Sequence, residues 1–158
     1  MDALAQKLGE RLKAARAKLV TAESCTGGWA AQVVTSVAGS SGWFERGFVT
    51  YSNEAKRELL GVREETLQKH GAVSEETARE MAQGALRRGR GTVALAVTGV
   101  AGPGGGSPTK PVGMVCFAWA SARSVRSETQ QFSGDRESVR RQYVIRALEG
   151  VLQHLDGG

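Results

Sequence analysis

The spacing of apolar and polar residues changes along this chain, from helical periods interrupted by short strands to a late cluster of strands. Apolar residues at helical spacing, together with capping residues, predict five helices: 2–17, 29–37, 53–60, one that begins at Ser74 and one capped by Asp135. Runs rich in β-branched and apolar residues predict five strands: 18–22, 46–51, 92–100, and a hairpin of 112–120 and 124–132. The run 92–100 is apolar almost throughout, which is typical of a strand buried on both faces.

This order of elements predicts the fold class. Helices alternate with strands early in the chain and strands gather late, which favours an α/β protein, a three-layer α/β/α sandwich with a mixed, mostly parallel sheet. We find no internal repeat, linker or low-complexity tract, so one domain over residues 1–158 is the expected organisation.

Composition narrows the class of protein. The 158 residues are 41% hydrophobic and 23% charged, and no apolar run is long enough for a membrane span. The start of the chain lacks the pattern of a signal peptide, so we expect a cytoplasmic protein. Cys25 and Cys116 match no metal-ligand spacing and only two histidines accompany them, so we expect no metal and two buried thiols.

The net charge is +5 and the isoelectric point is near 9.6. Such an excess attracts nucleic acid, a membrane surface or a phosphorylated small molecule. The basic residues are scattered, however, and aromatic residues do not interleave with them, which gives little support to a platform for single-stranded nucleic acid. Solvated helix faces explain most of the positive charge.

A first loop that could bind a ligand or take part in a reaction is residues 23–28, Glu-Ser-Cys-Thr-Gly-Gly, between a predicted strand and a predicted helix. Backbone N–H groups of Thr26, Gly27 and Gly28 at the positive end of a helix dipole make a candidate anion site. Capping of the helix by Ser24 or Thr26, with the glycines needed only for packing, explains the same residues.

A second segment joins Ala38-Gly39-Ser40-Ser41-Gly42 to Tyr51 and Lys56. A lysine whose pKa is lowered by burial can accept the proton of a serine hydroxyl, and a tyrosine can orient the pair. Serine, tyrosine and lysine are common, so a surface position of Lys56 is the simpler alternative.

A third loop runs from Thr98 to Ser107 and continues into Lys110-Pro111-Val112-Gly113. Its glycines allow a close approach of the backbone to a ligand. Neither a phosphate-binding P-loop nor the dinucleotide fingerprint fits, because the glycine spacing differs and a strand follows instead of a helix. A ligand-binding loop is favoured over a simple connection.

Taken together and in order, these blocks resemble the CinA C-terminal domain family, whose stand-alone members include nicotinamide mononucleotide amidohydrolases. Further matching blocks are Arg46-Gly47-Phe48-Val49-Thr50, Gly71-Ala72-Val73-Ser74 and Phe132-Ser133-Gly134-Asp135-Arg136. The resemblance covers nearly the whole chain. It implies an α/β/α domain, without a cofactor, that hydrolyses the carboxamide of nicotinamide mononucleotide to nicotinic acid mononucleotide and ammonia.

The resemblance also implies site residues. Serine–lysine chemistry carries over onto Ser41 as nucleophile, Lys56 as general base and acid, and Tyr51 as their partner, with Ser24 as the competing nucleophile. The substrate would contact the glycine-rich turns and a basic side chain, and the candidates are Thr26, Gly27, Gly28, Thr98, Gly99, Gly102, Gly104, Gly105, Gly106, Lys110, Arg136 and Arg140. We expect a homodimer or a larger homo-oligomer, with no nucleic-acid or membrane partner. A nucleotide-binding regulatory module without turnover and a DNA-associated protein are the alternatives.

Overall fold

A single five-stranded sheet of order β2-β1-β3-β4-β5 organises the chain, whose computed structural model describes residues 1–157. The strands are β1 Leu19–Glu23, β2 Phe44–Val49, β3 Val93–Gly99, β4 Met114–Ser121 and β5 Val125–Gln131. The helices are α1 Asp2–Ala14, α2 Trp29–Thr35, α3 Asn53–Leu60, α4 Glu64–His70, α5 Glu75–Gly89 and α6 Arg136–Gly157, with a 3₁₀ turn at Ser40–Gly42.

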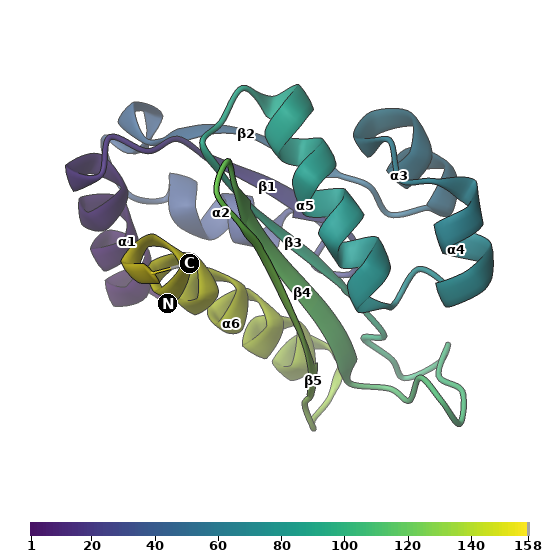
Figure 1. Cartoon of the computed structure of the whole chain (residues 1–158). Helices are drawn as coiled ribbons and strands as arrows, with labels where there is room; N and C mark the ends of the chain where they lie inside the picture. Colours follow the sequence, from purple (N-terminus) through teal and green to yellow (C-terminus); the bar gives the residue numbers. More distant parts are fainter. Residues whose placement is uncertain (158) are drawn as a thin grey trace.

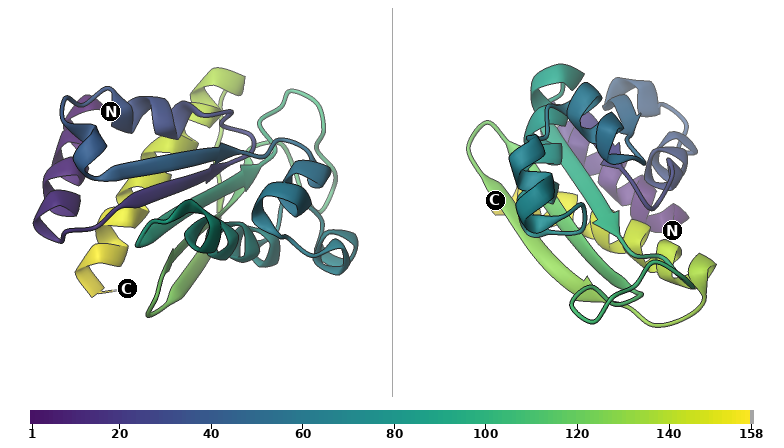
Figure 2. Two further views of the ribbon diagram at one scale, coloured as in Figure 1. Left: turned by 90° about the horizontal axis from the view of Figure 1, so that it is seen from above. Right: turned by 90° about the vertical axis from the view of Figure 1, so that its right-hand side faces the viewer.

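The sheet is mixed. β1 pairs in parallel with β2 on one side and with β3 on the other, whereas β4 and β5 are antiparallel to their neighbours. Helices cover both faces, α1, α2 and α6 on one and α5, supported by α3 and α4, on the other (Figures 1 and 2). The predicted three-layer α/β/α class is therefore confirmed.

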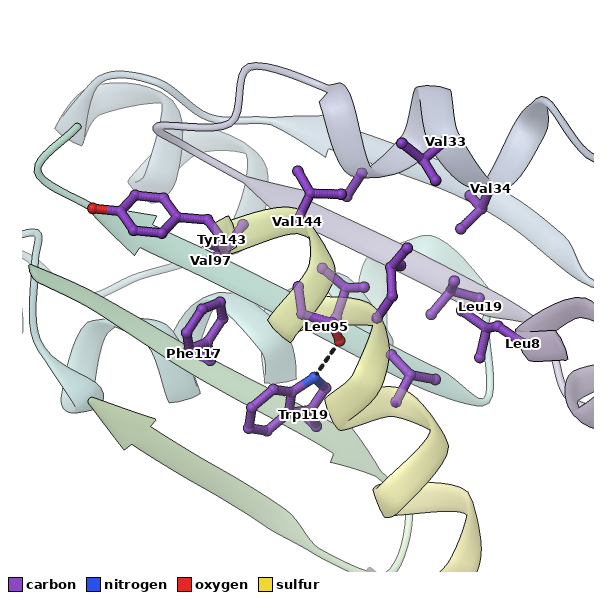
Figure 3. Close-up of a cluster of buried hydrophobic side chains, with 14 of the residues drawn as sticks. Leu8, Leu19, Val33, Val34, Leu95, Val97, Phe117, Trp119, Tyr143 and Val144 are labelled. Atoms are coloured by element: carbon purple, nitrogen blue, oxygen red, sulfur yellow. Dashed lines mark hydrogen bonds between the residues drawn. The ribbon is translucent and has the colours of Figure 1, made fainter. Parts of the chain in front are cut away.

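The larger core lies between the sheet and the helices α1, α2 and α6 (Figure 3). Trp119 of β4 is fully buried there, and its indole N–H donates to the carbonyl of Ala147 in α6 at 2.9 Å. Gly150 lets α6 approach this ring, because a Cβ at that position would overlap the indole. A second core, rich in alanine, lies under α5, where small side chains allow the helix to pack closely on the sheet.

Two differences from the predicted elements have clear physical causes. The first helix ends at Ala14 and not at residue 17, because Arg16 adopts a left-handed conformation with φ of 55° that ends the helix. Helix α4 was not predicted, because its N-cap residue, Arg63, provides no side-chain cap. Its start is capped instead by Glu80 of α5, whose carboxylate accepts from the Arg63 amide at 2.9 Å and from the Thr66 hydroxyl at 2.5 Å.

The topology determines where a site can form. The connection from β1 to β2 contains α2 on one face, and the connection from β2 to β3 contains α3, α4 and α5 on the other. In open α/β sheets, such a switch of direction opens a crevice outside the carboxyl ends of the strands where it occurs. The loops that follow β1, β2 and β3 all reach this end, where Figure 1 also places α3, α4 and the long loop after β3.

Candidate active site

Ser24 is the first residue after β1 and is still fixed to the sheet. Its backbone N–H donates to the carbonyl of Val97 in β3 at 3.1 Å, and the Gly27 amide closes a turn onto the Ser24 carbonyl at 3.0 Å. The side chain is almost fully buried and faces the end of β2. The nucleophile candidate thus sits at the carboxyl end of β1, the middle one of the three adjacent parallel strands.

Lys56 reaches Ser24 from α3. The helix begins after Ser52, whose hydroxyl caps it by accepting from the Ala55 amide at 3.0 Å. The Lys56 side chain is 1% exposed, and its Nζ lies 3.0 Å from the Ser24 Oγ. This close buried pair could not be deduced from the sequence alone, where a surface lysine was the simpler alternative.

Two main-chain carbonyls complete the surroundings of the amine. Lys56 Nζ donates to the Thr50 carbonyl at 2.9 Å and to the Tyr51 carbonyl at 3.3 Å. Carbonyl oxygens only accept hydrogen bonds, so a neutral amine places its two N–H groups on them. The lone pair of the neutral amine is then left for the remaining neighbour, the Ser24 hydroxyl, and can accept its proton. In the ammonium form, the third N–H of Lys56 donates to the Ser24 Oγ.

Burial favours this neutral form. Desolvation lowers the pKa of Lys56 from its ordinary value of 10.5 to about 8, and the nearby Cys25 opposes the shift. Burial also raises the pKa of the Cys25 thiol to about 12, so this neighbour of Ser24 stays protonated at neutral pH. A thiol that does not ionise is a poor nucleophile, which favours Ser24 over Cys25.

A cavity of about 300 Å³ opens onto the pair. It is lined by residues at and after the ends of three neighbouring strands, by α3, by the connection between α4 and α5, and by the start of α6. These residues are Ser24, Cys25, Tyr51, Lys56, Ala72, Val73, Thr98, Gly99, Val100, Ala101, Gly102, Gly104, Gly105 and Arg136. Arg136 connects two of these lining residues, donating to the Gly102 carbonyl at 2.6 Å and to the Tyr51 hydroxyl at 3.2 Å. The cavity therefore has a serine and an amine in its wall and a guanidinium among its lining residues.

The sequence matches the CinA C-terminal domain family over residues 1–155. The chain belongs to this family. It is 57% identical over 151 residues to the nicotinamide-nucleotide amidohydrolase PncC of Escherichia coli K12, covering 95% of this chain and 92% of that protein. PncC of Pseudomonas putida is 55% identical over 150 residues, covering 95% and 94%. The competence/damage inducible protein of Agrobacterium tumefaciens has a similar structure, with a TM-score of 0.94 and 46% identity over 98% of this chain and 94% of that one.

The CinA C-terminal domain brings together only part of the set that sequence reasoning proposed. Of the four catalytic candidates, Ser24, Tyr51 and Lys56 meet at the cavity. Thr98, Gly99, Gly102, Gly104, Gly105 and Arg136 join them as lining residues. The Tyr51 phenol is exposed, and it is the carbonyl of this residue that contacts Lys56.

Ser41 is not brought to Lys56. It lies in the exposed 3₁₀ turn before β2, where its carbonyl accepts from Lys18 at 3.4 Å, at the amino end of the parallel strands. A six-residue strand spans about 20 Å, so β2 separates this turn from the carboxyl end where Lys56 lies. The signal that distinguishes the two serines is their position relative to the strands, since only Ser24 follows one.

The predicted anion site at the start of α2 contains a carboxylate of the chain itself. Glu23, which the sequence analysis assigned no role, accepts from the Ala30 amide at 2.8 Å, the Ala31 amide at 3.1 Å and the Thr26 hydroxyl at 2.7 Å. Thr26 is fully buried by this contact, and neither Gly27 nor Gly28 lines the cavity. The Ala30 and Ala31 amides at the start of α2 are therefore already hydrogen-bonded to a side chain of the protein itself.

Three other candidates do not line the cavity and have structural contacts of their own. Arg140 donates to the carbonyls of Cys25 and Thr26 at 3.0 and 3.1 Å and lies over the Trp29 ring. Lys110 donates to the carbonyl of His70 and lines a different hollow. Gly106 packs against Val112, where a Cβ would come within 2.9 Å of the backbone nitrogen.

Within residues 1–157, no three His, Cys, Asp or Glu side chains gather closely enough to hold a metal ion. Over the same residues, no helix has the length and apolar character needed to cross a membrane.

Proposed function

We propose that this chain is an amidohydrolase that converts nicotinamide mononucleotide to nicotinic acid mononucleotide and ammonia. Ser24 is the nucleophile and Lys56 is the general base and acid. The observation that carries the proposal is the 3.0 Å contact between the Lys56 Nζ and the Ser24 Oγ in a buried ring of acceptors. The family and the printed names of the PncC relatives supply the substrate.

The first half of the reaction forms an ester. Neutral Lys56 takes the Ser24 proton as Oγ attacks the carboxamide carbon, and a tetrahedral oxyanion forms. The ammonium of Lys56 then gives this proton to the departing nitrogen, the C–N bond breaks, and ammonia leaves. The acyl group, which is the pyridine nucleotide joined through its carboxyl carbon, stays on Ser24.

The second half reverses the roles. Lys56, neutral again, removes a proton from a water molecule that attacks the ester carbon. The tetrahedral intermediate collapses, Ser24 regains its proton from Lys56, and nicotinic acid mononucleotide is released. Atoms balance with one water consumed and one ammonia formed.

The oxyanion needs fixed hydrogen-bond donors. The backbone N–H of Cys25 follows the nucleophile, belongs to a residue that lines the cavity, and donates to no other residue within 1–157. We assign the oxyanion to this amide. The substrate phosphate is assigned to Arg136, a cavity-lining cation that also begins the 22-residue helix α6, whose positive dipole end adds to its charge.

The test compares two serine variants in one assay. Ammonia release from nicotinamide mononucleotide is measured for the wild type, Ser24→Ala, Ser41→Ala and Lys56→Met. We expect losses of at least about a thousandfold in Ser24→Ala and Lys56→Met, because a serine and its base act as a unit, and less than a twofold change in Ser41→Ala. Activity retained in Ser24→Ala but lost in Ser41→Ala would reverse the assignment.

A wild type that binds the nucleotide without releasing ammonia would instead favour the regulatory module. Rapid acid quenching followed by mass spectrometry of peptides locates the acyl group, which we expect on the peptide that contains Ser24. A cytoplasmic location and a homo-oligomeric state stay predictions from the sequence.

A further inference from the structure

We infer that Glu23 is a positioning residue for the nucleophile. Its buried carboxylate holds the turn from Ser24 to Gly28, and thereby fixes the directions of the Ser24 hydroxyl and of the Cys25 amide. This inference rests on the proposed function and adds to it a residue that touches neither the substrate nor the reacting atoms.

All partners of the carboxylate belong to one short segment. Its two oxygens accept from the Thr26 hydroxyl and from the amides of Ala30 and Ala31, at 2.7 to 3.1 Å. The side chain is 1% exposed and is not part of the cavity lining. A carboxylate in the interior is costly unless it is well hydrogen-bonded, and here every partner lies between residues 26 and 31.

Arg140 also contacts this turn, through the carbonyls of Cys25 and Thr26, but the side chain that accepts from the amides at the start of α2 is that of Glu23. Gly28, the N-cap residue of α2, has φ of 103° and no side chain with which to cap the helix. Glu23 therefore supplies the acceptor that Ser, Thr or Asp usually provides at a helix start. Glu23 directly precedes Ser24 and its hydrogen-bond partners follow Ser24, so these contacts link the chain on both sides of the nucleophile.

The backbone of the same residue connects the nucleophile to the base. The Glu23 carbonyl accepts from the Thr50 amide at 2.8 Å. The Thr50 carbonyl in turn accepts the shortest of the hydrogen bonds that Lys56 donates. The hydrogen bond between the Thr50 amide and the Glu23 carbonyl thus fixes the position of Lys56, while the Glu23 side chain fixes the turn that follows Ser24. Loss of the carboxylate would keep the main-chain contact to Thr50 and remove the contacts to the turn.

The test uses a matched pair of glutamates. Glu80 caps α4 in a similar way: its carboxylate accepts from the Arg63 amide and the Thr66 hydroxyl, and in addition from the Arg63 guanidinium at 3.4 Å. It is absent from the lining of the Ser24 cavity. Glu23→Gln and Glu80→Gln are compared for melting temperature, for kcat and KM of ammonia release, and for the rate at which an alkyl fluorophosphonate modifies Ser24.

For Glu23→Gln we expect kcat to fall about 10- to 100-fold with KM changed less than twofold, since a misplacement of about 1 Å costs up to about a hundredfold in rate. Modification of Ser24 slows in parallel, and the apparent pKa of activity stays the same, because Glu23 is not among the groups that shift the pKa of Lys56. Glu80→Gln keeps kcat and labelling within twofold even if its melting temperature falls.

A folded Glu23→Gln protein with wild-type kcat and labelling would overturn the inference, and so would equal losses in the two glutamine variants. If Glu23→Gln does not fold, Thr26→Val replaces it, removing one of the three donors at nearly constant volume. We expect labelling about three- to tenfold slower in that variant, and an unchanged rate would count against the role. The labelling assay needs no nucleotide, so slower labelling in Glu23→Gln combined with an inactive wild type would reject the substrate while supporting the positioning role.

Discussion

Replacing Lys56 by Met tests whether burial lowers the pKa of this amine in the folded protein. Methionine keeps the length and apolar stem of the side chain and removes the ionisable group. The pKa of Lys56 is lowered from 10.5 in the unfolded chain to about 8 in the fold. Between these two values the unfolded state binds one more proton than the folded state, and stability therefore rises with pH in this window.

The size of the effect follows from the same two values. Below pH 8 the lysine is protonated in both states, and the folded state bears the full cost of a buried charge. At about 1.4 kcal/mol for each pH unit, the wild type gains about 2.5 kcal/mol of unfolding free energy relative to Lys56→Met between pH 7 and pH 10. The comparison between the two proteins cancels groups that titrate equally in both.

The assay is urea unfolding at pH 7, 8, 9 and 10, followed by the fluorescence of the buried Trp43 and Trp119. Lys69→Met, on the exposed side of α4, is the matched control and should keep the pH dependence of the wild type. Parallel stability curves for the wild type and Lys56→Met would show that the lysine is protonated in the fold up to the pKa of the free side chain. The reasoning about the neutral base would then be refuted.

Three further predictions follow from the site. The value of kcat/KM should rise about tenfold from pH 7 to pH 9, because Lys56 must be neutral to act as the base; a profile flat over this range contradicts its role. Gly84→Ala should lower the unfolding free energy by about 1–3 kcal/mol and reduce kcat, because its Cβ would overlap the backbone of α3. Gly42→Ala, with open space around it, should change neither quantity when unfolding and rates are measured. Arg136→Gln should raise KM for nicotinamide mononucleotide more than tenfold and leave turnover of the riboside, which lacks the phosphate, nearly unchanged; equal losses for both substrates would remove Arg136 from the phosphate site.

Most of the fold follows from local patterns in the sequence. The apolar run that became β3 and the hairpin of β4 and β5 were predicted within a few residues of their observed bounds, because burial on both faces and a short connection leave clear signals. Helix α4 was missed because its cap comes from Glu80, which lies 17 positions after Arg63, the residue whose amide donates to it. A support of this kind depends on tertiary contact and has no local signature.

Which serine lies beside Lys56 depends on information of the same non-local kind. Both serines lie in short turns beside glycines, and what separates them is that Ser24 follows a strand whereas Ser41 precedes one. The strand register decides: Glu23 pairs with Val49 of β2, so the residue after each lies at the same edge as the segment that leads to Lys56. Ser41 comes before β2 and is directed to the other edge.

Main-chain atoms do most of the work of holding this base. Two carbonyls, those of Thr50 and Tyr51, accept from Lys56, and the position of Thr50 is set by its own amide on the Glu23 carbonyl. A carboxylate in place of the carbonyls would favour the ammonium and raise the pKa of the lysine, whereas neutral acceptors in a buried site leave desolvation as the dominant effect. The geometry that fixes the amine is thus also the reason why its pKa falls to about 8. The one carboxylate beside the nucleophile, Glu23, has its oxygens hydrogen-bonded to the turn before α2, away from the amine.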